Sequence, residues 1–412
     1  MWQRVSWKWK NVIDNCPSLW TSITIINRTE HTKSQLEKSK GLPVDIKILA
    51  GLSKHPGGDW TKLLVDNAHR WKSLVLDGYS LEFTEQIESS PLKLDHLNFQ
   101  FVEIPHDCKL FNLIRPKLRK LHLGVVTIPH SFDPTLGLEE LQLYDVYEQI
   151  EDGWATTLSA SKFHQFLQTN PNLRILEIDE VADASPNDSG LQPVSLPRLE
   201  NVTSLKSQVL HLFRAEHCVD VRFTVRSVAE TPPLSAWTTF VHTLRRVERL
   251  KITVSDSYLS LRAVGGPYKV ELLLDTSDAG DENMRNLVYS MLKDILDEAE
   301  KDTPIRARVD IALFAFKRWR SDFDVSFEIL KLLQTPVCDF SSGKPHWRIP
   351  NLDTISMPHP GLPYCHLRAF VLARSNGTCS PITGIFTRSH AFDDKYCEEV
   401  LNNVMAYTLG VN

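Results

Sequence analysis

The residues with the greatest chemical potential gather near the C-terminal end, where thiols, imidazoles and carboxylates lie close in sequence. A Cys–His pair with a carboxylate can act as a thiol hydrolase, and Cys with His can bind zinc. The spacing favours neither, because Cys365 and His366 are adjacent and no second close pair exists. A Cys/His hydrolase is therefore only a remote alternative. The group comprises His346, His359, Cys365, His366, Cys379, His390, Asp393 and Asp394.

The motifs of common nucleotide-binding and hydrolytic sites are missing from the rest of the sequence. There is no G-x-G-x-x-G, G-x-x-x-x-G-K-[ST], G-x-S-x-G or H-E-x-x-H. Gly265-Gly266-Pro267 is the nearest approach to a glycine-rich loop, but no Lys-Ser/Thr follows it, so it predicts a simple turn. We predict a protein that is not an enzyme, with no catalytic, cofactor-binding or metal-binding residue.

Composition places the chain among ordinary globular proteins. Of its 412 residues, 42% are hydrophobic and 24% charged, and the net charge is −5. We expect neither nucleic acid nor a membrane as a partner, because the charge is small and no apolar run approaches the ~20 residues of a membrane span. The 7 cysteines form no C-x-x-C pair, which is typical of reduced thiols in the cytoplasm or nucleus.

The template L-x-x-L-x-L recurs along the chain and predicts the fold. The first copies start 23, 24 and 20 residues apart, within the 20–29 residues of leucine-rich repeats. Strand-plus-helix units of this kind stack, so we predict an α/β fold, an irregular leucine-rich-repeat-like solenoid with a parallel concave sheet. Exact boundaries after residue 200 are not predictable. The copies start at Trp71, Leu94, Leu118, Leu138, Leu173, Val247, Leu352 and Leu367.

Two details follow from the template. Alternation predicts buried Leu121, Leu123, Leu141, Leu143, Leu176 and Ile178, with exposed His122, Gln142 and Glu177 between them. Ordinary leucine-rich repeats carry Asn or Cys eight residues after the first Leu. Valine takes that place four times, which predicts apolar packing instead of a polar ladder: Val102, Val126, Val146 and Val181.

The variable positions of the template should line the concave face and contact a protein partner. Their charges alternate between basic and acidic, which suits recognition by electrostatic complementarity. The candidate partner surface is His96, Asn98, Lys120, His122, Gln142, Tyr144, Glu177, Asp179, Arg249 and Lys251, with Glu140 also facing outward.

Residues 5–23 predict an amphipathic helix, a turn and an apolar strand. Val5, Trp9 and Val12 recur at helical spacing, Pro17 ends the helix, and Ile23 begins the alternation of a strand. This segment resembles the last third of an F-box and the first strand of F-box/leucine-rich-repeat proteins of mushroom-forming (basidiomycete) fungi. Matching positions are Val5, Trp9, Val12, Ile13, Pro17, Leu19, Trp20, Thr21 and Ile23. Residues 39–46 and 69–74 resemble later strands of that family.

The resemblance implies the substrate-recognition subunit of a cullin–RING ubiquitin ligase. The F-box would grip a Skp-family adaptor, and the repeats would hold an unknown substrate protein. We divide the chain into residues 1–22, the C-terminal remnant of an F-box, and residues 23–412, the repeat domain, less regular over 275–412. The adaptor-facing residues would be Val5, Trp9, Val12, Pro17, Leu19 and Trp20.

The early F-box helices have no counterpart before Val5, so we expect the adaptor to bind weakly or not at all. Trp2, Trp7 and Trp9 should then pack partly on the first strands. A ligase-independent scaffold without a working F-box remains an alternative function.

Overall fold

The computed structural model divides the chain into two compact units, residues 1–199 and 200–412, each considered by itself. The residues that it describes are 7–25, 29–49, 59–78, 94–104, 118–129, 132, 137–149, 155–179, 181–182, 190–204, 207–225, 243–244, 246–254, 258–275, 293, 308–313, 336–338, 345–347, 352–357 and 384–387.

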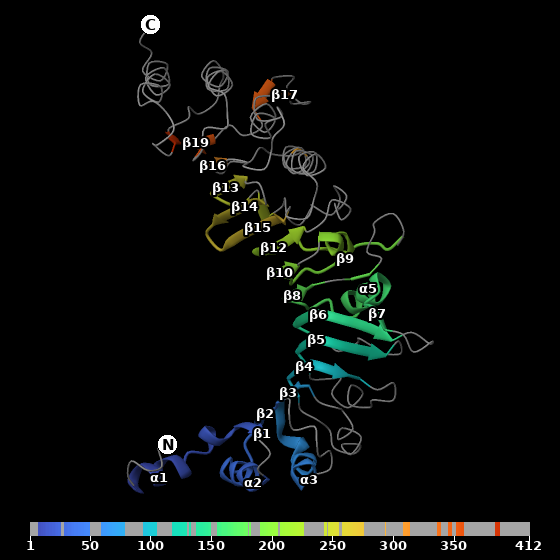
Figure 1. Cartoon of the computed structure of the whole chain (residues 1–412), viewed down its shortest axis with the longest axis vertical. Coiled ribbons are helices and arrows are strands. Elements are labelled where there is room, and N and C mark those ends of the chain that lie inside the picture. The colour runs from blue at the N-terminus through green and yellow to red at the C-terminus, as the bar shows by residue number, and fades with distance from the viewer. Residues whose placement is uncertain are drawn as a thin grey trace. The chain divides into compact units, whose positions relative to one another are not determined.

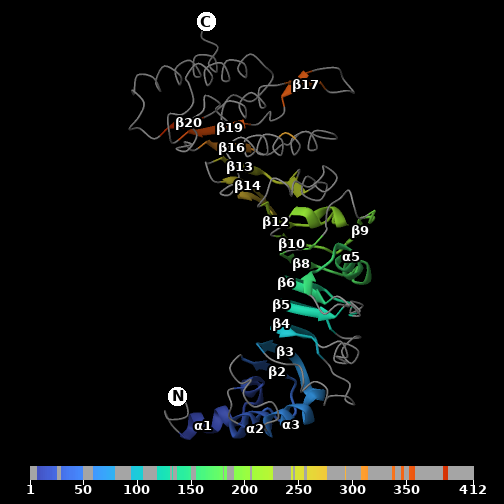
Figure 2. The same ribbon diagram turned by 45° about the vertical axis from the view of Figure 1, so that its right-hand side comes forward.

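Unit 1 is built on a parallel sheet whose strands follow one another in chain order (Figures 1 and 2). Leu74, Leu97, Leu121, Leu141 and Leu176 are paired across neighbouring strands, which confirms the predicted parallel sheet. The strands are β1 (Ser22–Ile25), β2 (Val44–Ile48), β3 (Trp71–Asp77), β4 (His96–Glu103), β5 (Lys120–Pro129), β6 (Glu140–Gln149) and β8 (Ile175–Ile178), with β7 (Ala155–Thr157) antiparallel to β6.

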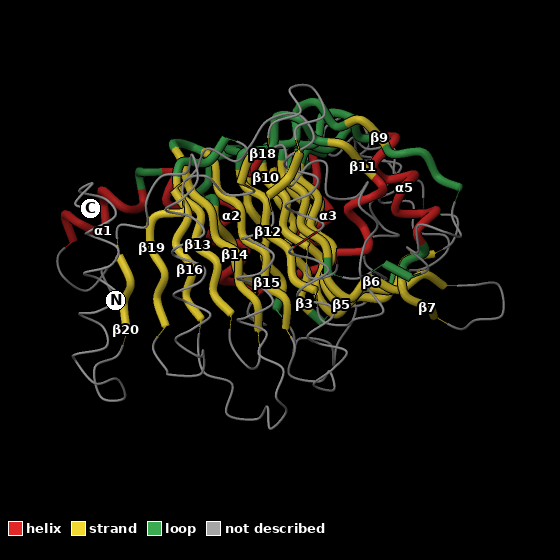
Figure 3. Tube along the Cα trace, turned by 90° about the horizontal axis from the view of Figure 1, so that it is seen from above, coloured by secondary structure: helices red, strands yellow, loops and turns green. Residues whose placement is uncertain are grey.

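Helices and one short strand complete unit 1, and α5 lies to one side of β5 and β6 (Figure 3). Ser159 caps α5 by accepting a hydrogen bond from the Lys162 backbone amide. The apolar face of this helix is buried, at Phe163, Phe166 and Leu167. The elements are α1 (Trp7–Asp14), η2 (Pro17–Trp20), α2 (Thr29–Lys38), α3 (Asp59–Asp66), η3 (Ala68–Arg70), α5 (Ala160–Thr169) and β9 (Val194–Ser195).

Arg70 and Trp71 join the start of β3 to the rest of unit 1. Trp71 begins β3 and is fully buried. The Arg70 guanidinium donates to the carbonyl of Leu42 at 2.9 Å and to the Ser39 hydroxyl. It thereby ties the segment after α2 to the start of β3, and its burial lowers its pKa.

The core side of the unit 1 sheet is as predicted, but the opposite face is less exposed than expected. Leu121, Leu141 and Leu176 are 0% exposed, and Leu123, Leu143 and Ile178 are at most 1% exposed. His122, Gln142 and Glu177 are half-buried, so their predicted exposure was wrong. The cause is the short spacing of paired strands, which packs each polar side chain against its neighbours.

A left-handed residue interrupts the alternation at the same place in three neighbouring strands. Phe101, Val125 and Asp145, the left-handed column, have φ values of 55°, 52° and 48°. Each adds one residue to the solvent face, so the next residue turns back to the core. Val102, Val126 and Val146 are accordingly buried, as is Val181, which confirms apolar packing at these positions.

The main sheet of unit 2 contains strands that are parallel except around β14. β14 is antiparallel to β13 and to β15, whereas the other neighbours run parallel. Parallel repeats were expected throughout, and β14 overturns this. The strands are β10 (Asn201–Ser204), β12 (Asp220–Val225), β13 (Arg249–Val254), β14 (Tyr258–Gly265), β15 (Tyr268–Asp275), β16 (Arg308–Leu313), β19 (Leu352–Met357) and β20 (Gly384–Thr387).

The reversal follows from the glycine pair. Gly266 has a φ of +55°, and it links β14 to β15 in a tight turn, so the predicted turn is confirmed. Unit 2 also contains η5 (Ser207–Leu212), β11 (Phe213–Arg214) and the antiparallel pair β17 (Pro336–Cys338) and β18 (Pro345–Trp347).

Leu141→Ala should lower the free energy of unfolding by about 2–5 kcal/mol, because it leaves a cavity in the core of unit 1. Gln142→Ala, on the opposite face, is the control and should cost only about 1 kcal/mol. Denaturant unfolding measures both, and equal losses would contradict the assignment of the two faces.

Val125→Asn should raise the thermal midpoint, because a β-branched residue in the left-handed region is strained by roughly 1–2 kcal/mol while asparagine tolerates it. The matched control is Val126→Asn, which places an amide in the core and should lower the midpoint. A drop of similar size in both variants would show that position 125 is not strained.

Candidate protein-interaction surfaces

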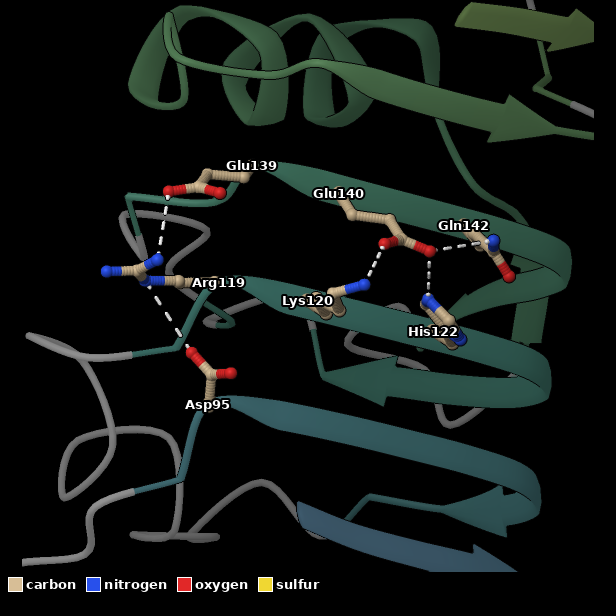
Figure 4. Close-up of polar contacts among 7 residues, drawn as sticks. All are labelled: Asp95, Arg119, Lys120, His122, Glu139, Glu140 and Gln142. Atoms are coloured by element: carbon tan, nitrogen blue, oxygen red, sulfur yellow. Dashed lines mark hydrogen bonds and ion pairs between the residues drawn. The ribbon is translucent and has the colours of Figure 1, made fainter. Parts of the chain in front are cut away.

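A polar ladder crosses β4, β5 and β6 on the solvent face of the unit 1 sheet, and Figure 4 shows its side chains on β5 and β6. Strand pairing sets His96, Lys120 and Glu140 in one row, and Asn98, His122 and Gln142 in the next. Regular pairing therefore gathers side chains from three separate repeats. We call His96, Lys120, His122, Glu140 and Gln142 the polar ladder.

The Glu140 carboxylate is the centre of the ladder. It pairs with Lys120 Nζ at 2.8 Å and accepts hydrogen bonds from His122 Nε2 at 2.9 Å and Gln142 Nε2 at 3.1 Å. It faces outward from the sheet as expected, but its side chain is only 12% exposed, so it is largely shielded from water. Burial alone would raise the pKa of Glu140, but the hydrogen bonds from Lys120 and His122 outweigh it and lower the pKa.

His96 lies beside this centre. Its ring is 4.8 Å from that of His122, centroid to centroid, with the planes inclined by 63°. Burial, followed by the positive charges of His122 and Lys120, lowers the pKa of His96, which favours the neutral ring. The buried Nε2 of His96 has no hydrogen-bond partner, so the ring fills space without anchoring the ladder.

An ion-pair chain runs along the edge where the strands begin (Figure 4). Arg119 lies 3.6 Å from both Asp95 and Glu139, measured between charged atoms. Its side chain is 62% exposed, so these pairs add little stability. The polar ladder contributes more to stability than this ion-pair chain, because the Glu140 carboxylate is shielded from water.

Polar contacts also link the other predicted residues of unit 1. The amide of Gln100 donates to Asn98 Oδ1 at 3.1 Å, and the Tyr144 hydroxyl donates to Glu177. Burial, together with the Glu177 carboxylate, raises the pKa of Tyr144. The structure therefore brings the candidate residues from His96 to Asp179 onto one face, whereas Arg249 and Lys251 are exposed on β13 in unit 2.

The N-terminal segment presents a second surface. α1 buries none of its residues, and Trp7, Trp9, Val12 and Leu19 are between 58% and 71% exposed. The expected packing of Trp7 and Trp9 on the first strands was therefore wrong. Val5 and Trp2 lie outside the described residues.

Trp20, unlike Trp7 and Trp9, is half-buried and contacts the neighbouring helices. Its indole N–H donates to the carbonyl of Ile13 at 2.8 Å, and Lys38 Nζ lies 4.1 Å from the centre of its ring. Lys38 also pairs with Asp14 at 2.8 Å. These contacts hold α1 and α2 beside Trp20. Pro17 is half-buried, and α1 has no buried residue.

The C-terminal Cys/His group lies outside the described residues, apart from the backbone of His346 in β18. Where the structure is described, no cluster of three or more His, Cys, Asp or Glu could hold a metal ion. Within the same residues, no helix is long and apolar enough to cross a membrane.

Sequence reasoning found the face but missed two of its features. The central role of Glu140 depends on the side chains of the neighbouring repeat, Lys120 and His122, that strand pairing brings beside it. The exposure of Phe101 and Val125 depends on a backbone conformation that apolar residues rarely adopt, so no residue pattern signals it.

Comparison with known proteins finds no family model, no curated protein and no solved structure that matches the chain significantly.

Glu140→Gln should destabilise the chain at neutral pH by roughly 1–3 kcal/mol, because the partners of the carboxylate lose its charge. A carboxyl pKa lowered by folding stabilises above its ordinary value of 4.5 and loses that contribution as the pH falls through the folded pKa. The gap between wild type and variant should therefore shrink below about pH 4. Denaturant midpoints measured from neutral to acid pH test this, and a constant gap would contradict it.

Proposed function

We propose that the chain is a non-enzymatic protein-recognition module that binds a protein partner on the solvent face of its unit 1 sheet. The observation that carries this proposal is the polar ladder, a set of side chains from successive repeats fixed in register by Glu140. Side chains already ordered before binding lose little entropy in a complex, which favours recognition. The recurring L-x-x-L-x-L template favours a leucine-rich-repeat-like solenoid, in which such a face would be the binding surface.

We further propose that the partner is a substrate of a cullin–RING ubiquitin ligase and that the N-terminal segment contacts a Skp-family adaptor. Two observations support this: the F-box-like pattern that begins at Val5, and the exposure of Trp9, Val12 and Leu19. Large exposed apolar side chains in one segment are typical of a protein-binding surface. If no adaptor binds this segment, the chain would act as a ligase-independent scaffold, which is the second candidate function.

Capture of a purified fungal Skp-type adaptor by this chain should be weak and lost on washing. A single two-turn helix covers only a fraction of the ~1,200–2,000 Å² of a stable interface. The double variant Trp9→Ala/Leu19→Ala should weaken capture at least about tenfold, because aromatic anchors dominate such contacts.

The control is Val264→Ser, which removes an exposed apolar side chain from unit 2. It should leave capture unchanged. Pull-down followed by biosensor titration measures all three proteins. Capture that the double variant does not weaken would contradict the assigned surface, and no capture at any concentration would favour the scaffold.

A further inference from the structure

The left-handed column gives the solvent face of unit 1 an apolar strip. Phe101 is 63% exposed, Val125 38% and Tyr147 36%. Gln100 pairs with Gly124, and Val102 with Val126, so Phe101 and Val125 lie on adjacent strands. Tyr147 lies on the next strand, opposite Thr127. Three large side chains therefore face solvent on neighbouring strands.

The strip is surrounded by carboxylates. We call the solvent-facing residues from the row of Gln100, Gly124 and Tyr144 to the strand ends the carboxyl half of the face. Among the described residues of β3 to β8 in this half, none is Lys, Arg or His. Its acidic residues are Asp77, Glu103, Asp145 and Asp179.

The two halves of the face therefore differ in charge. In the polar ladder the Glu140 carboxylate is matched by Lys120 and His122. In the carboxyl half, Glu103 and Asp145 are exposed beside Phe101 and Val125. Carboxylates beside an apolar surface repel acidic segments and attract cations, and Lys and Arg also pack their stems and charges against aromatic rings.

Gly124 lies in the first row of this half, and the Gln100 side chain covers it. A Cβ at Gly124 would lie 2.1 Å from Gln100 Oε1, so the Gln100 amide lies directly over the glycine. Gln100 and Tyr144 flank Gly124 in the paired strands. A glycine inside a strand suits the close approach of another chain.

Building on the proposed protein-recognition function, we propose that the carboxyl half binds a basic segment of the protein partner. The segment carries Lys or Arg residues around one large apolar side chain. The apolar side chain contacts Phe101 and Val125, and the cations lie against Glu103 and Asp145.

The test uses three fluorescein-labelled octapeptides and the full chain. One peptide has a central Leu flanked by Lys and Arg, the second replaces the cations with Glu, and the third replaces the Leu with Ser. Fluorescence anisotropy should show the first peptide binding at least about tenfold more tightly than the others. Raising the salt concentration should weaken it, because the charges are exposed.

Two variants locate the peptide on the face. Glu103→Gln/Asp145→Asn removes charge, and Phe101→Asn removes the ring; asparagine tolerates the left-handed backbone at 101 and 145. Each should weaken binding about tenfold. The controls are Glu216→Gln and Leu273→Ser, exposed residues of unit 2, and they should not change binding. Circular dichroism checks that each variant folds.

Tighter binding of the acidic peptide, unchanged binding in both carboxyl-half variants, or no peptide binding up to ~1 mM would overturn the inference. These results leave the proposed function separately testable. If the acidic peptide binds the chain and the variant Lys120→Gln no longer binds it, recognition by this face is still supported. The adaptor contact is measured separately, by pull-down.

Discussion

Parallel pairing of equivalent residues is the constraint on which the rest of unit 1 depends. Each repeat places its leucines beside the leucines of the next, as at Leu121 and Leu141, and its polar residues beside polar residues. Each row of the sheet therefore contains side chains of similar polarity. This is favourable inside, where apolar side chains leave water together. On the other face it demands that successive repeats alternate in charge or carry neutral side chains, since like charges in register repel.

The polar ladder meets that demand by varying one position across three repeats. The row that begins at His96 continues with Lys120 and then Glu140, so the positive charge lies beside the negative one. The interaction is local, but it orients His122 and Gln142 as well. Exposed ion pairs add little stability. A surface that contacts only solvent therefore does not require a shielded carboxylate with three partners.

The sequence was sufficient for what depends on apolar periodicity. The register of Leu97, Leu121 and Leu141 and the burial of the valines follow from side-chain type and spacing. What failed depends on the backbone or on neighbours distant in sequence. β14 reverses direction at Gly266, the left-handed column is held by pairing on both sides, and the exposure of Trp7 depends on which elements are available to cover it.

The left-handed column links the fold to the division of the face. Without the extra residue at 101, 125 and 145, strict alternation would turn Val102, Val126 and Val146 toward solvent. With the extra residue, these three valines extend the core, and the apolar side chains of Phe101 and Val125 are exposed in their place. A fold gains nothing from this exchange in buried area, and it also bears left-handed strain at a phenylalanine and a valine. Retained strain of this kind is characteristic of sites that bind, and it marks the boundary between the charge-compensated ladder and the acidic, apolar half beyond it.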